Sequence, residues 1–253
     1  MLLTYLEAEN LKFKRSLFRK LVLFIPAALI VTSMIFLFIG IGSGGFSSSF
    51  VCNWCMPVGS LSIVILCHLV NNKDGKHKYR TLYSLPINLK TTFISKVILT
   101  ALNFLIISLL LAFITILSEG MVSGITAAIS HAAYYILAYC LLWLSFLWQI
   151  PFCLYLDRKT GFVGSVIINL LASASCGLFF SLTPLFWAFP YGWAARYMIT
   201  LFGVLPNGLL AGADSGKILS LGEISLLALI SLLAVLGLTA LFARWYGRQV
   251  YRK

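Results

Sequence analysis

Residues 97–117 read VILTALNFLIISLLLAFITIL, a run without a single Asp, Glu, Lys or Arg. An α-helix rises about 1.5 Å per residue, so a run of this length reaches across the roughly 30 Å hydrocarbon core of a bilayer. Only a helix fits there, because an open strand would leave its backbone N–H and C=O groups unpaired in lipid. The stretch therefore predicts a membrane-spanning helix in an all-α membrane protein.

Five further stretches share this length and lack of charge, which gives six expected spans. The six cover Leu21–Ile41, Val51–Val70, Val97–Leu117, Ala132–Leu156, Gly161–Phe180 and Ile224–Phe242. Of the 253 residues 60% are hydrophobic and 10% are charged, whereas soluble domains carry about 25% charged residues. The first run is also longer than the apolar core of a signal peptide. Residues 1–253 are therefore interpreted as one transmembrane domain whose first helix is retained.

Lysine and arginine set the predicted orientation. Seventeen of the 19 lie before the first span or after the second, fourth and sixth spans. These four segments all lie on the same side of the membrane. Cytoplasmic loops carry the excess of basic residues, so both termini are predicted to be cytoplasmic. This distribution also accounts for the formal net charge of +12. Nucleic-acid binding is not expected, because it would need the basic residues clustered on a soluble face.

Three segments lie outside the spans. Residues 1–20 place Leu2, Leu6 and Phe13 on one helical face with basic residues largely opposite, which predicts a helix lying along the inner membrane surface. Residues 73–96 are polar, basic and expected in the cytoplasm. Residues 181–222 are nearly uncharged and rich in Trp, Tyr and Phe. Aromatic rings prefer the membrane interface, so we expect this segment at the outer surface, partly re-entrant.

The motifs of ATPases and of intramembrane zinc proteases do not occur in the sequence. It has neither a Walker A motif nor HExxH, and His68, His77 and His131 have no carboxylate at helical spacing. Cys52 and Cys55 form a CxxC pair, but a zinc site would need further ligands that do not follow at the right spacing. We therefore expect no enzyme activity, no cofactor and no metal in this chain, and three isolated histidines at the membrane interface.

Ionisable residues are scarce near the expected spans. The acids closest to them are Glu119 and Glu223 at outer ends and Asp157 at an inner end. A secondary transporter would need ionisable groups near the middle of the membrane, so this pattern argues against ion coupling. For the neutral polar residues inside the spans, hydrogen bonding between helices is favoured over substrate contact. These residues are Asn103, Gln149 and Asn169.

Residues 73–86 read KDGKHKYRTLYSLP and predict a short amphipathic helix. Tyr79, Leu82, Tyr83 and Pro86 follow the i, i+3, i+4, i+7 spacing of one helical face, and proline ends the helix. Asn88 can then cap the helix of the third span. An aromatic stripe with a basic flank fits either a groove on a soluble partner or an anionic lipid surface, and the residues alone leave both open.

The order of these elements resembles the permeases of ABC-2 type exporters. More specifically, the chain is similar to the lantibiotic-protection permeases of the MutE/EpiE type. The residues that carry the resemblance are KYRTLYSLP at 78–86, QIPF at 149–152 and GVLPNG at 203–208, with looser likeness at 53–54 and 190–196. The likeness runs nearly end to end. Cys52 and Cys55 depart from the aromatic or aliphatic neighbours that the family pattern has there.

The resemblance implies a heteromeric transporter in a bacterial cell membrane, most naturally that of a Gram-positive cell. A separate ABC ATPase subunit would bind ATP and Mg²⁺, and a second related permease subunit would pair with this chain. The substrate would be a lantibiotic, expelled from the bilayer of the producing cell. Residues 1–20 would be the elbow helix, and the segment between spans two and three would be the coupling helix. The residues implied in coupling are Lys78, Tyr79, Arg80, Leu82, Tyr83, Leu85 and Pro86.

Peptide recognition would fall on the outer surface, where interfacial anchoring of the rings has equal weight. The residues considered for it are Trp54, Trp187, Tyr191, Trp193 and Arg196. Two other functions stay open. One is an ABC-2 exporter permease for another amphipathic compound, and the other is a membrane protein that sequesters the peptide without transporting it. Protection without an ATPase would distinguish the second.

Overall fold

The computed structural model describes residues 2–14, 16–39, 45–75, 87–212 and 218–248. Most of these residues form helices, and among the described residues the only β-type pairing is a bridge between Val204 and Leu210. The α-helices are α1 (Leu2–Lys12), α2 (Leu17–Phe38), α3 (Gly45–Asn53), α4 (Gly59–Gly75), α6 (Leu89–Ser123), α7 (Ile125–Phe146), α8 (Gln149–Ser175), α9 (Trp193–Phe202) and α10 (Leu221–Gly247). Shorter turns are η1 (Trp54–Val58), η2 (Cys176–Phe180), η3 (Pro184–Trp187) and η4 (Pro190–Gly192).

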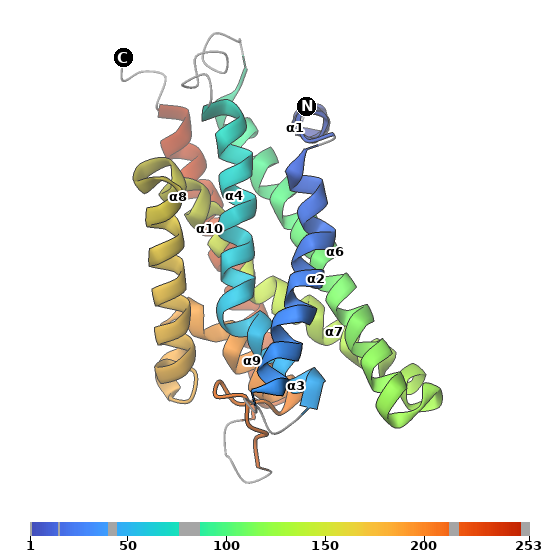
Figure 1. Ribbon diagram of the computed structural model, residues 1–253. Helices are drawn as coiled ribbons and strands as arrows, with labels where there is room; N and C mark the ends of the chain where they lie inside the picture. The colour runs from blue at the N-terminus through green and yellow to red at the C-terminus, as the bar shows by residue number, and fades with distance from the viewer. Residues whose placement is uncertain (1, 15, 40–44, 76–86, 213–217, 249–253) are drawn as a thin grey trace.

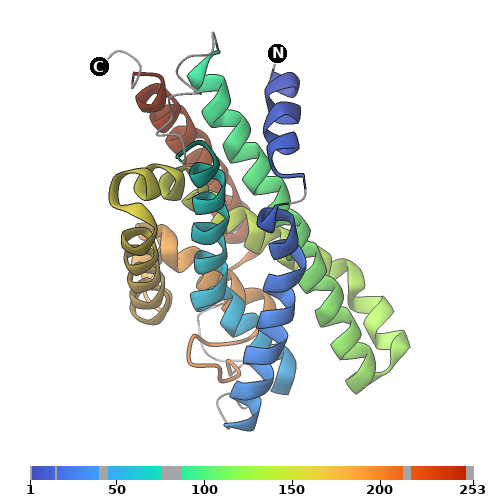
Figure 2. The same ribbon diagram turned by 45° about the horizontal axis from the view of Figure 1, so that its top comes forward.

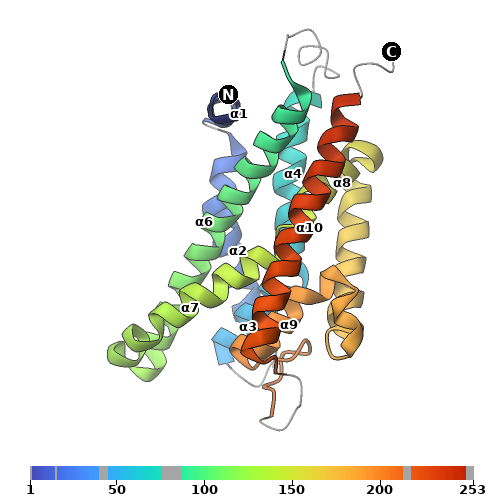
Figure 3. The same ribbon diagram turned by 180° about the vertical axis from the view of Figure 1, so that it is seen from behind.

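The long helices run roughly along one direction and give the molecule two ends (Figure 1). Helix α1 and the last turn of α10 lie at one end, which is called the terminal end below. Helices α3 and α9 lie at the opposite end, called the distal end. Seen from behind, α6 and α10 cover the face away from α4, and α7 crosses obliquely (Figure 3).

Five helical stretches are long and apolar enough to cross a membrane, which marks the chain as a membrane protein. They are Leu17–Phe38, Gly45–Gly75, Leu89–Ser123, Ile125–Phe180 and Leu221–Gly247. The six spans expected from the sequence differ from this count because the fourth and fifth both fall within Ile125–Phe180. That stretch contains one backbone break, at Gly161 with φ +76° and ψ −179°. A residue with a Cβ adopts a positive φ only at a cost. The ribbon of α8, which contains this break, turns back on itself (Figure 1).

Helix α4 lies at the centre of the helix bundle, and α2 lies at its edge. In the most apolar window of each stretch, 72% of the residues of Gly45–Gly75 are buried, against 22% of those of Leu17–Phe38. The exposed side chains of α2 include Leu23, Phe24 and Val31. Large apolar side chains turned outward are what lipid-facing helices require, so α2 presents a surface suited to the bilayer or to another membrane subunit.

A π-helical turn, η1, connects α3 to α4 and contains Pro57. Proline removes one backbone donor, and the wider turn accommodates that loss. The turn directs Trp54 into the core, where its ring stacks on Phe104 at 5.3 Å between centroids and meets Phe146 edge-on at 6.1 Å. Gly59 follows, and a Cβ there would lie 2.7 Å from both Phe146 and the Trp54 carbonyl oxygen. Only glycine fits at position 59 without displacing Phe146 or the Trp54 carbonyl group.

Two helix starts are capped by side chains. The prediction that Asn88 caps the third span is confirmed, since its Oδ1 accepts from the backbone N–H of Lys90 at 3.0 Å. At the start of α10, the Ser220 side chain and Glu223 exchange hydrogen bonds in a capping box. Each cap satisfies donors that the first helical turn otherwise leaves unpaired.

Candidate functional site

A buried polar cluster joins four helices at the terminal end. It consists of Glu9, Lys12, Asp74, Lys96 and Tyr246 and is called the terminal network below. Lys96 Nζ lies 2.5 Å from Asp74 Oδ2 and 3.4 Å from the Tyr246 hydroxyl. The other Asp74 oxygen, Oδ1, accepts from Lys12 Nζ at 3.2 Å, and Lys12 also pairs with Glu9 at 2.7 Å. One carboxylate thus bridges α1 and α6 to the end of α4.

Burial explains why the terminal network must be complete. The Lys96 side chain is 0% exposed and that of Asp74 is 11% exposed. A buried charge is tolerated only when it is paired, and removing one partner of such a pair costs about 3–5 kcal/mol. The network contains two lysines and two acids, so its formal charges balance. Lys96 also makes a cation–π contact with Tyr246, since its Nζ lies over the ring, 5.6 Å from the centroid.

A second polar cluster lies beside the first and joins α4 to α8. His68 Nδ1 is 2.8 Å from Asp157 Oδ1, and Asn71 donates to Asp157 Oδ2 at 3.0 Å and to the Leu154 carbonyl at 2.9 Å. Both oxygens of the buried Asp157 carboxylate are therefore satisfied. The His68 ring packs on Phe162, beyond the break at Gly161, with 4.6 Å between centroids.

The last turn of α10 connects the two clusters. The Arg158 guanidinium lies over the Tyr246 ring at 4.6 Å and over the Trp245 ring at 5.5 Å. Tyr246 thus has Lys96 on the side of α6 and Arg158 on the side of α8. Through this residue the start of α6, the middle of α8 and the end of α10 form one packed unit.

These partnerships are not predictable from the sequence pattern. The prediction that the polar cytoplasmic segment extends to Lys96 is wrong, because Lys96 lies inside α6 and is fully buried. The expectation of isolated histidines is wrong for two of the three, since His68 pairs with Asp157 and His131 with Glu119 at 2.8 Å. The one available signal is Lys96 itself, a lone charge between FIS at 93–95 and the apolar run that begins at Val97.

The residues predicted to contact the ATPase, Lys78 through Pro86, lie outside the described residues. Both flanks of this segment are described. Asp74 precedes it and belongs to the terminal network, while the Asn88 N–H that follows it donates to the Tyr5 hydroxyl of α1 at 3.0 Å. The segment is therefore bordered on both sides by contacts to α1.

The outer residues considered for peptide contact are mostly turned into this chain's own core. Trp54 is 0% exposed, and Trp193 is 3% exposed with its indole N–H on the Phe186 carbonyl at 3.0 Å. Arg196 lies 4.8 Å over the Phe186 ring and donates to the Ser181 carbonyl at 3.2 Å. Burial lowers the pKa of Arg196, which the negative charge of Glu223 opposes. Trp187 is half-buried.

The three neutral polar residues of the spans have different surroundings. Asn169 accepts from the Tyr191 hydroxyl at 2.7 Å and from Cys153 Sγ at 3.3 Å. These bonds connect η4 with the parts of α8 before and after the break at Gly161. Burial raises the pKa of Tyr191, so its hydroxyl keeps the proton that it donates. Asn103 donates to the Leu99 carbonyl of its own helix at 2.8 Å. Gln149 is buried at the start of α8.

The six cysteines are free thiols, and those of the CxxC pair have separate surroundings. Cys52 lies near the carbonyl oxygens of Leu205 and Pro206, and Cys55 is buried. Within the described residues no group of three or more His, Cys, Asp or Glu side chains is arranged to hold a metal ion.

Comparisons of the chain with protein-family models, with curated proteins and with solved structures gave no match.

Proposed function

We propose that this chain is the permease subunit of an ATP-driven ABC-2 type exporter that expels a lantibiotic-type peptide from the cell membrane and so protects the cell. In this proposal it has six spans with the break at Gly161 separating the fourth from the fifth, and both termini are cytoplasmic. A separate ABC ATPase supplies ATP hydrolysis, and a second related permease completes the pore. The resemblance of residues 78–86, 149–152 and 203–208 supports this assignment.

The terminal network is the observation that carries the proposal. An ATPase can move a permease only if the segment that it contacts is firmly attached to the spanning helices. Asp74 and Asn88 border residues 76–86, and both are bound to α1, while Asp74 also holds the buried Lys96 of α6. A displacement of the segment would therefore move α1, α4 and α6 together as near-rigid bodies.

A cavity at the distal end supports an amphipathic substrate. It has a volume of about 630 Å³ and lies between α2, α3, α6 and α7. Its walls are mainly apolar, with Ile30, Met34 and Leu117 among them, and the one charged residue among the described residues that line it is Glu119. An apolar wall with one carboxylate complements a peptide that carries apolar and cationic side chains.

Copurification tests the proposal directly. The full chain is isolated from its native membrane in mild detergent, its companions are identified by mass spectrometry, and ATPase activity is measured with and without added lantibiotic. We expect a Walker A protein and a second six-span permease. Changing Tyr79 and Leu82 together to Ala should abolish peptide-stimulated ATPase activity, whereas Lys20→Ala, an exposed change outside the segment, should leave it intact. Recovery of the chain alone, with no ATPase, would refute the proposal.

The second polar cluster favours one other candidate function, transport coupled to a proton gradient. The buried Asp157 pairs with His68, whose side chain is 30% exposed, and acid–base pairs in spanning segments serve as proton sites in transporters. In that case peptide export would persist without ATP and would collapse when the pH gradient is dissipated. His68→Asn would abolish export while leaving peptide binding unchanged. Export that requires ATP and survives His68→Asn excludes this candidate.

A further inference from the structure

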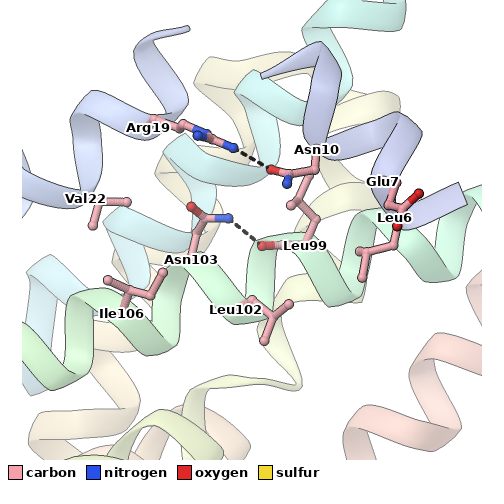
Figure 4. Close-up of a pocket in the computed structure, with 9 residues that line it drawn as sticks. All are labelled: Leu6, Glu7, Asn10, Arg19, Val22, Leu99, Leu102, Asn103 and Ile106. Atoms are coloured by element: carbon pink, nitrogen blue, oxygen red, sulfur yellow. Dashed lines mark hydrogen bonds between the residues drawn. The ribbon is translucent and has the colours of Figure 1, made fainter. Parts of the chain in front are cut away.

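We propose that a hollow between α1, α2 and α6 binds one phospholipid whose headgroup carries both a phosphate and a primary ammonium. The hollow has a volume of about 530 Å³, within the range of about 300–1,000 Å³ that is usual for small-molecule sites. Its rim is polar, formed by Glu7, Asn10 and Arg19, and its floor is apolar (Figure 4). Figure 2 shows α1 beside the first turns of α6. Helix α6 forms one side of the hollow.

The charges on the rim are not neutralised by the described residues. Arg19 Nη2 donates to the neutral Asn10 Oδ1 at 2.9 Å, and no described carboxylate pairs with this guanidinium. Glu7 has neither an ion pair nor a side-chain hydrogen bond with any residue of the described ranges. A guanidinium with free N–H groups and a free carboxylate on one rim complement a headgroup that is itself zwitterionic.

The remaining residues of the hollow specify an ammonium that can donate hydrogen bonds. Asn103 uses its Nδ2 for the Leu99 carbonyl, and its oxygen lies on the side of the hollow that faces Arg19 (Figure 4). Glu7 lies on the opposite side of the hollow from Asn103 and supplies an acceptor there, which a primary ammonium can use and a quaternary one cannot (Figure 4). No aromatic residue lines the hollow among the described residues, and recognition of quaternary ammonium groups uses aromatic faces.

The floor fits acyl chains. Val22, Leu99, Leu102 and Ile106 form it, and Leu102 and Ile106 are 45% and 49% exposed. These two side chains belong to a helix long and apolar enough to span the membrane, so their exposed surface is suited to contact with acyl chains. A phospholipid seated with its headgroup on the rim would run its chains along this strip and fasten α1 to α2 and α6.

Native mass spectrometry of the purified full chain tests this inference. Phosphatidylethanolamine, phosphatidylglycerol and phosphatidylcholine are added separately, and bound lipid is counted against concentration. We expect one tightly held phosphatidylethanolamine. Arg19→Gln and Glu7→Gln should each weaken it about ten- to hundredfold, the loss expected for one charge-assisted contact. Lys14→Gln and Lys20→Gln, exposed cations that do not line the hollow, should change it less than twofold.

Three outcomes would overturn the inference. Equal binding of all three lipids, unaffected by either rim variant, would mean nonspecific annular lipid. Tighter phosphatidylglycerol binding that rises with Glu7→Gln would mean an anion site without the ammonium contact. Equal losses in the rim variants and in the two lysine controls would mean a general effect of surface charge. The thermal midpoint of each variant without lipid shows whether the fold is retained.

Discussion

The terminal and distal ends of the molecule use their few acids differently. Of the seven acidic residues in the sequence, Glu9, Asp74 and Asp157 have side chains that are at most 11% exposed and form ion pairs at the terminal end. At the distal end, Glu119 pairs with His131, whose side chain is 57% exposed. Packing at that end depends instead on aromatic rings and neutral hydrogen bonds. The ion pairs of the terminal end thus lie where helices converge and exclude water, whereas the distal pair lies in contact with it.

The largest effect is expected from breaking the terminal network. Lys96→Met leaves the Asp74 carboxylate with Lys12 as its one ion-pair partner among the described residues and should lower the free energy of unfolding by about 3–5 kcal/mol. The measurement is a denaturant titration of the detergent-solubilised chain, followed by tryptophan fluorescence. The double variant with Asp74→Leu should recover most of the loss. A cost below about 1 kcal/mol for Lys96→Met would remove the contrast between the ends.

A smaller loss of stability is expected at Gly59, where the start of α4 packs against Phe146 at the end of α7. Gly59→Ala places a Cβ 2.7 Å from the Phe146 ring and from the Trp54 carbonyl, which should cost about 1–3 kcal/mol by overpacking. Gly237→Ala is the matched control, because nothing lies within 4 Å of its added Cβ and alanine favours the helix. The same titration compares the two variants. Equal stabilities of the Gly59→Ala and Gly237→Ala variants would show that the surroundings of Gly59 are loosely packed.

At the distal end a neutral hydrogen bond should contribute less than the terminal ion pairs. Tyr191→Phe removes the donor to Asn169, which still accepts from Cys153, so the expected cost is about 0.5–1.5 kcal/mol. Tyr5→Phe removes an exposed hydrogen bond at the terminal end and should cost less. Hydrogen exchange of η4 should rise only in the first variant. A cost for Tyr191→Phe equal to that of Lys96→Met would reverse the comparison.

The smallest effect is expected for the exposed distal ion pair. His131→Gln removes the partner of Glu119, and because water screens the pair the cost should stay below about 1 kcal/mol. Raising the salt concentration should shrink even this difference between variant and parent. A cost as large as that of Lys96→Met would mean that the distal pair is shielded by another molecule in the purified sample.

Parts of the fold were predictable because they depend on local sequence. Long uncharged runs specify membrane helices wherever they occur, and Asn88 caps α6 because its side chain reaches donors only two or three residues away. The number of spans depends on one residue, because Gly161 breaks α8, which is otherwise continuously helical. The expected roles of Trp54 and Arg196 were drawn from residue type, which does not show whether a side chain faces membrane or core.

The sequence by itself determined that this chain is an all-helical membrane protein, because hydrocarbon forces long apolar segments to satisfy their own backbone hydrogen bonds. It also determined which segments carry the basic residues. Only the tertiary structure decided which charges meet. Asp74 and Lys96 are separated by 22 residues and His68 and Asp157 by 89, and no local pattern records these distances. Such pairs depend on how whole helices pack, where the cost of burying a charge selects the partner that compensates it.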